Sequence, residues 1–173
     1  AYIGTRHFAD DRKHLGLPSG KALWRYVYPR AFEKEVLLNG RRFDVPPEFV
    51  WSIMKAETNF RPDAMSPVGA RGLMQVMTHT GRKVASMIGK TVTGPDLLHP
   101  KTNVEIGTRY LMRNLKKFDG KIPLAAAAYN GGPHRVHSWL HQFGGLAMDE
   151  FIEHIPFLET RNYVKKVTRY YTL

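Results

Sequence analysis

The sequence contains no cysteine, which excludes disulfide bonds, thiol nucleophiles, thiolate zinc sites and iron–sulfur clusters. It also lacks any stretch near the roughly 18 consecutive apolar residues of a membrane-spanning helix, so we expect no membrane span. No secretory signal pattern is present, and the chain begins at Ala1 rather than Met. We therefore expect a mature form or an excised piece of a longer protein.

Acidic residues are scarce relative to basic ones. Among 173 residues, 26 Lys and Arg stand against 15 Asp and Glu, so the formal net charge is +11 with His neutral. This balance favours a polyanionic partner: nucleic acid, an anionic membrane surface or an acidic cell-wall polymer. Hydrophobic residues make up 43% of the chain and charged residues 24%, which excludes wholesale disorder and suits one compact domain.

Long alternating strand patterns are missing as well, whereas apolar residues recur at helical spacing. We predict an all-α fold of about eight helices. Asn39-Gly40 is predicted to end the first helix, and Pro46-Pro47 to open the second. A loop is predicted over residues 63–72, which are rich in Pro and Gly. The remaining helices are predicted over residues 73–88, 104–118, 124–129 and 133–143, in a short segment from Asp149, and over residues 159–171.

Glu57 is the first candidate for catalysis. It follows Ile53 by four residues and Met54 by three, so helical geometry places its carboxyl on the apolar stripe. Desolvation there raises the pKa of a carboxyl, and a neutral acid near pH 7 can protonate a glycosidic oxygen. The alternative is an ordinary Glu near a helix end that faces solvent or pairs with Arg61.

The segment after Glu57 combines tight turns with polar groups. Gly69 and Gly72 permit backbone conformations that other residues avoid. Ser66 and Gln75 carry groups that suit the hydroxyls and amides of sugars. Met77 could contact a sugar, although packing in the core is the commoner role for a methionine.

Two other clusters could carry different chemistry. His134, His137 and His141 share a helix face, but no Glu lies between them as in zinc proteases, which favours surface or groove histidines over a metal site. Basic residues near Lys165 and Lys166 could bind nucleic acid, but no nucleic-acid motif accompanies them, so a solvated basic helix is favoured. We expect no metal, no cofactor and no nucleic-acid partner.

Three segments occur in an order typical of one enzyme family. They are ETNFRPDAMSPVGARGLMQVMTHT at 57–80, AAYNGGPHRV at 127–136 and FIEHIPFLETRNYV at 151–164. Together they resemble the signatures of the soluble lytic transglycosylases, whose catalytic domain is similar to goose-type lysozyme. The resemblance implies a lysozyme-like catalytic domain over residues 41–173, which leaves residues 1–40 as a linker or lid segment.

The resemblance also implies roles for individual residues. Glu57 falls on the single catalytic glutamate of the family. The positions implied to bind substrate are Ser66, Gln75, Met77, Tyr129, Asn130, Glu153 and Tyr163. Thr58, Thr78 and Gly131 depart from the usual Ser, Pro and Ala of the family, and none of these changes removes a reacting group.

The implied reaction is a non-hydrolytic cleavage of peptidoglycan glycan strands that leaves 1,6-anhydro-N-acetylmuramic acid ends, with a role in cell-wall turnover. One alternative is a hydrolytic muramidase of the same fold, and another is an inactive glycan-binding module. A basic nucleic-acid binder is a third. If the protein is a lytic transglycosylase, we expect a monomer in the bacterial cell envelope, in the periplasm.

Overall fold

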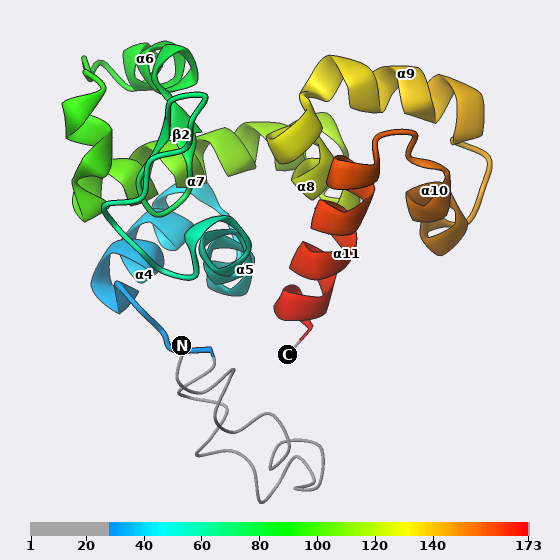
Figure 1. The fold of residues 1–173 in the computed structure, drawn as a ribbon, viewed down its shortest axis with the longest axis horizontal. Helices are drawn as coiled ribbons and strands as arrows, with labels where there is room; N and C mark the ends of the chain where they lie inside the picture. The colour runs from blue at the N-terminus through cyan, green and yellow to red at the C-terminus, as the bar shows by residue number, and fades with distance from the viewer. Residues whose placement is uncertain (1–27, 173) are drawn as a thin grey trace, which may run out of the picture.

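The computed structural model describes residues 28–172 of the chain. Apart from one short hairpin, the regular structure of this part consists of helices, which confirms the all-α prediction and the expected number of helices (Figure 1). The helices are α4 (Glu33–Phe43), α5 (Pro47–Thr58), α6 (Thr78–Ser86), α7 (Pro100–Lys117), α8 (Ile122–Gly131), α9 (Pro133–Phe143), α10 (Met148–His154) and α11 (Leu158–Tyr171), with a 3-10 turn η1 (Pro95–Leu98). Two short strands, β1 (Ala70–Arg71) and β2 (Val76–Met77), form a hairpin.

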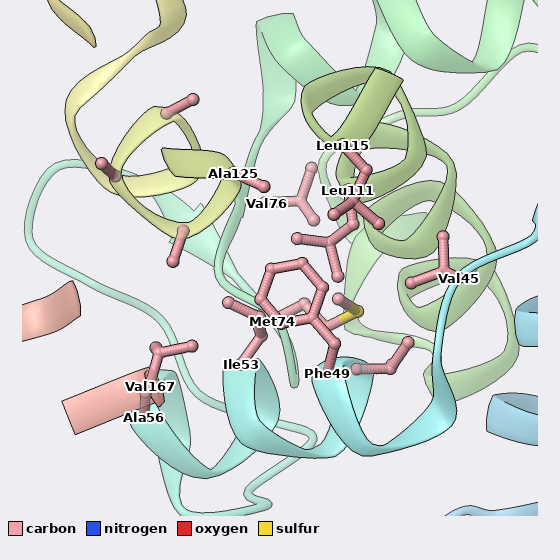
Figure 2. Packing of buried hydrophobic residues seen from close by; sticks show 14 of the residues in the cluster. Val45, Phe49, Ile53, Ala56, Met74, Val76, Leu111, Leu115, Ala125 and Val167 are labelled. Atoms are coloured by element: carbon pink, nitrogen blue, oxygen red, sulfur yellow. The ribbon is translucent and has the colours of Figure 1, made fainter. Parts of the chain in front are cut away.

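The helix α5 supplies the centre of the core. It begins at Pro47, where a missing backbone N–H costs nothing, and it ends at Thr58, after which Asn59, with a φ of 52°, turns the chain out of the helix. Phe49 and Ile53 are fully buried, and Figure 2 shows them packed against Met74 beside side chains of α7 and α8. Burial of each large apolar side chain contributes about 1.5–3 kcal/mol, which fixes the orientation of α5.

Two groups of helices lie on either side of the molecule, and α7 connects them (Figure 1). One group holds α4, α5, α6 and the hairpin, and the other holds α8 to α11. The C-terminal helix α11 packs against both α5 and α8, so it joins the two groups at the end of α5.

The predicted end of the first helix at Asn39-Gly40 is wrong. The Asn39 side chain donates to the Glu35 carbonyl at 2.8 Å and stays within the helix. Gly40 is needed for close packing, because a Cβ there would lie 2.9 Å from the Val45 carbonyl oxygen. The helix α4 therefore continues to Phe43, and Asp44, with a φ of 54°, turns the chain out of it.

The prediction of one helix over residues 73–88 is also wrong in its first part. Residues 73–77 form a turn and β2, and α6 begins only at Thr78. Gly72 and Gln75 adopt positive φ values of 71° and 47°, which break the helical path. Tertiary hydrogen bonds hold this path: Asn103 accepts from the Met74 N–H and donates to the Arg71 carbonyl, both at 2.8 Å.

The predicted division into an N-terminal segment, 1–40, and a domain, 41–173, stays a prediction, because residues 1–27 lie outside the described residues. Within the described part, α4 continues across residue 40, packs against α7 and buries Val36 completely. Between residues 28 and 172, no helix combines the length and the apolar character needed to cross a bilayer.

Candidate active site

Glu57 lies in the last turn of α5, at the contact of α5 with α11. Its side chain is half-buried, between the buried residues Ala56 and Thr58. Tyr163 of α11 donates its phenolic O–H to Glu57 Oε1 at 2.7 Å. The structure thus places the candidate acid at the edge of the core, against a hydroxyl from a distant part of the chain.

The surroundings of Glu57 favour its protonated form. Loss of water raises the pKa of this carboxyl from an ordinary 4.5 to about 7. The Tyr163 hydrogen bond and the positive charge of Lys166 lower the pKa, whereas the negative charge of Glu159 raises it. At neutral pH both protonation states are populated, so one carboxyl can donate a proton and later accept one.

Two tyrosines adjoin Glu57: Tyr163, which is buried, and Tyr129, which is partly buried. Tyr129 of α8 donates its O–H to the Met74 carbonyl at 2.7 Å and so ties α8 to the hairpin turn. Burial raises the pKa of Tyr129 and of Tyr163 well above the ordinary value, and the charge of Glu57 adds to both rises. Both side chains therefore stay neutral hydroxyls. Of the residues named from the sequence, Glu57, Tyr129 and Tyr163 are brought together.

Ser66, Gln75 and Met77 belong to the hairpin and its approach. Ser66 Oγ accepts the Ala70 N–H at 2.9 Å, and Gln75 Nε2 donates to the carbonyls of Ala64 and Gly72 at 3.1 and 3.0 Å. These bonds shape the loop and use one polar function of each side chain. Met77 is half-buried in β2, where its backbone pairs with Ala70.

Asn130 and Glu153 have partners other than Glu57. Asn130 Oδ1 accepts the Thr160 hydroxyl at 2.7 Å, which joins the end of α8 to α11. Glu153 is exposed on α10 and forms an ion pair with Lys165 at 2.6 Å. The hydrogen bond from Lys165 lowers the pKa of Glu153, so this carboxyl stays ionised and cannot act as an acid near neutral pH.

Sequence reasoning missed several residues that build the site. Asn103 precedes the predicted helix 104–118 and matches no motif, yet it is fully buried and bonded to the hairpin. Lys166, expected on a solvated basic helix, donates to the Ala56 carbonyl at 2.7 Å, next to Glu57. Thr58, which replaces the usual Ser of the family, still carries a hydroxyl, and that hydroxyl donates to the Leu73 carbonyl at 3.0 Å.

The three histidines of α9 are not grouped as the ligands of a metal site. The ring of His137 lies 5.2 Å from the ring of Phe118, and His134 and His141 are exposed. In the part of the chain that the structure describes, no group of three or more His, Asp or Glu side chains is placed to hold a metal ion.

Replacing Tyr163 by Phe should raise the pKa of Glu57 further, because the carboxylate loses a hydrogen bond that stabilises its charged form. A general acid works while it is protonated, so the fall of kcat/KM at high pH should move to a higher pH. At pH 6 the loss of kcat/KM should not exceed about tenfold, because the reacting carboxyl remains. The measurement is a pH profile of kcat/KM on soluble substrate.

Tyr171→Phe is the matched control, because Tyr171 is on the same helix and its ring packs against Phe49. Its pH profile should coincide with that of the unchanged protein. A Tyr163→Phe profile that stays in place or moves to lower pH would contradict the role given to this hydrogen bond.

Comparisons with known proteins agree on one family. A family model described as the transglycosylase SLT domain matches residues 37–152. The soluble lytic murein transglycosylase of Salmonella typhimurium is 38% identical over 175 residues, which cover 98% of this chain and 27% of that protein. The corresponding Escherichia coli protein is 42% identical over 132 residues, 73% of this chain and 20% of the relative.

A solved structure is similar as well. The 70 kDa soluble lytic transglycosylase from Escherichia coli matches with a TM-score of 0.83 and 32% sequence identity, over 98% of this chain and 29% of that one. The chain thus spans about a quarter of the length of the relatives it matches.

Proposed function

Since the chain belongs to the transglycosylase SLT family, we propose that it cleaves the bond between N-acetylmuramic acid and N-acetylglucosamine in peptidoglycan without adding water. The family match also confirms the expected lysozyme-like helical fold. One observation supports the proposal most: a single half-buried carboxyl, Glu57, has a pKa of about 7 and is oriented by the Tyr163 hydroxyl. The relatives supply the substrate class, because their names describe enzymes that act on murein.

In the proposed reaction, Glu57 serves first as acid and then as base. Protonated Glu57 donates its proton to the bridging oxygen while the bond from that oxygen to C1 breaks. The acetamido group of the substrate stabilises the positive charge at C1. The 6-hydroxyl of the same sugar then attacks C1 and gives its proton to the Glu57 carboxylate. The products are a 1,6-anhydro sugar and a free hydroxyl, and Glu57 is protonated again.

The surroundings of Glu57 support a mechanism in which a group of the substrate takes the place of a second carboxyl. Glycosidases that rely on two carboxyls hold them about 5–5.5 Å apart to retain configuration, or about 6.5–9.5 Å apart to admit a water. Among residues 28–172, Glu159 is the one other carboxyl whose charge acts on Glu57, and it is exposed on α11. The hydrolytic muramidase, in which water replaces the 6-hydroxyl, is the alternative with the same fold and the same acid.

The remaining positions are proposed to hold the glycan strand. The hairpin would contribute one side of the groove, the end of α8 a second, and α10 and α11 a third. In this order the residues are Ser66, Gln75 and Met77, then Tyr129 and Asn130, then Glu153 and Tyr163. For Tyr129 the bond to Met74 supports a positioning role, with its ring rather than its hydroxyl available to a sugar.

A substrate of this kind lies outside the bacterial cytoplasmic membrane. We therefore propose that the protein acts in the cell envelope, in the periplasm, as a monomer. The net charge of +11 supports attraction to a wall polymer that carries carboxylates.

Incubation with purified insoluble peptidoglycan should release soluble muropeptides at a rate proportional to the amount of protein. The reason is that the proposed cleavage cuts the glycan strands, whereas a glycan-binding module leaves them intact. Chromatography of the supernatant measures the release. Protein that sediments with the wall but releases no fragments would be a binding module, and the enzymatic proposal would be dropped.

A further inference from the structure

The surface next to Glu57 is hollowed, and three of the seven residues that line it are basic. The seven lining residues come from the last turn of α5, the loop after it and one position of α11. They are Lys55, Ala56, Glu57, Thr58, Asn59, Arg61 and Lys166, which we call the basic hollow. Glu57 is the only acid of this lining, and it shares the hollow with three cationic side chains, of which Lys166 is the one whose charge acts on Glu57.

Backbone carbonyls hold two of these cations at the rim. Lys166 Nζ donates to the Ala56 carbonyl at 2.7 Å, and Arg61 Nε donates to the Thr58 carbonyl at 3.3 Å. These bonds use one of three donors of the ammonium and one of five donors of the guanidinium. Both groups are therefore oriented and still have N–H groups to give to a ligand.

The ion pairs of the described part involve other cations. Lys90 and Arg42 share Glu105, and Lys165 binds Glu153. Between residues 28 and 172, neither Arg61 nor Lys166 lies within salt-bridge distance of a carboxylate. A ligand carboxylate would therefore meet two oriented donors without displacing an internal ion pair.

We propose that the basic hollow binds a carboxylate of the peptide that muramic acid carries in peptidoglycan, with Arg61 and Lys166 as donors. This proposal rests on the proposed function. The sugars of the strand are uncharged apart from this peptide substituent, so a cationic site beside the cleaved bond matches the peptide rather than the glycan. Because the hollow includes Glu57 itself, the recognised peptide belongs to a sugar at the cleaved bond or next to it.

Two substrates that differ only in charge test the proposal. Soluble glycan strands with peptides are used as they are, or after carbodiimide coupling with ammonia has turned the peptide carboxylates into primary amides. The unchanged protein should show a kcat/KM about fivefold higher on the free carboxylates, the size expected for a charge pair in contact with water. In Arg61→Gln and Lys166→Met this preference should fall to about one.

Lys117→Met is the matched control, because it removes the same charge from the exposed end of α7 and leaves the hollow intact. It should keep the fivefold preference. Arg61 is exposed, so its substitution does not endanger the fold. If Lys166 and Arg61 act only through the pKa of Glu57, both substrates should slow equally and the preference should persist, which would overturn the proposal.

Binding to Glu57→Gln protein separates this proposal from the reaction. Its Kd for the free-carboxylate strands should be about fivefold lower than for the amidated strands, and Arg61→Gln should abolish that difference. Equal Kd values would overturn the carboxylate site even if the enzyme is active. A fivefold difference without any cleavage by the unchanged protein would contradict the transglycosylase proposal and leave the carboxylate site in place.

Discussion

Glu57→Gln should reduce the turnover of peptidoglycan by at least about 10²-fold, the lower range for loss of general acid–base catalysis. The amide keeps the shape of the side chain and can still accept the Tyr163 hydrogen bond. It cannot supply a proton to the bridging oxygen or accept one from the 6-hydroxyl. Initial rates of muropeptide release at pH 6 to 7 measure the loss.

Glu48→Gln is the matched control, since Glu48 is an exposed acid in the first turn of the same helix. It should release muropeptides at the rate of the unchanged protein. Release by Glu57→Gln within about threefold of that rate would remove Glu57 from the mechanism, because even weak general acid catalysis contributes more.

The free energy of unfolding provides a second measurement on the Glu57→Gln protein. The pKa of Glu57 is about 7 in the folded protein and 4.5 as an ordinary carboxyl, so the folded state binds a proton that the unfolded chain releases between these values. Stability of the unchanged protein should therefore fall as the pH rises through this window. Glu57→Gln should gain about 1–2 kcal/mol relative to it by pH 8, a reduced figure because the side chain is only half-buried.

Asn103→Leu should lower the free energy of unfolding by about 3 kcal/mol or more. The fully buried amide donates to the carbonyls of Arg71 and Leu97 and accepts the Met74 N–H, at 2.7 to 2.8 Å. Leucine has a similar size but leaves three buried backbone groups without a partner. Denaturant unfolding measures the change, and muropeptide release should fall as well, because Met74 also anchors Tyr129.

Thr108→Val is the matched control on the same helix. Thr108 is fully buried, and its hydroxyl has no hydrogen-bond partner in residues 28–172. Valine fills the same volume without a polar atom, so the free energy of unfolding should stay the same or rise slightly. If Asn103→Leu costs less than about 1 kcal/mol, the amide does not hold the hairpin.

The structure could be predicted from the sequence where the residues of a single helix determine it. The apolar spacing of Phe49 and Ile53 predicted α5, and the same spacing placed Glu57 next to the core. The prediction from sequence failed where contacts between residues far apart in the chain determine the path of the backbone. Asn39-Gly40 looks like a helix end, but Gly40 serves close packing on the chain near Val45. Residues 73–77 have helical spacing, yet bonds to Asn103 hold them in a turn and a strand.

The candidate site, too, could be predicted from the sequence only in part. Motif resemblance singled out Glu57 and Tyr163, and the structure joins them by a hydrogen bond. It could not reveal that Tyr129 binds a backbone carbonyl or that Glu153 pairs with Lys165, because both contacts depend on how helices pack. Nor could any local pattern show that Lys166 reaches the end of a helix 110 residues earlier in the chain.

In the proposed mechanism, the sugar's own 6-hydroxyl, rather than water, attacks C1 after Glu57 has protonated the leaving oxygen. A well-placed internal nucleophile can act at an effective molarity of roughly 10⁵ M or more, far above that of water. The direct measurement is mass spectrometry of muropeptides from digested peptidoglycan, half of which has been reduced with borohydride. Attack by the 6-hydroxyl should give fragments that are lighter by one water than hydrolysed ones, with masses that borohydride leaves unchanged. Fragments that gain two hydrogens on reduction would identify a hydrolase and rule out attack by the 6-hydroxyl.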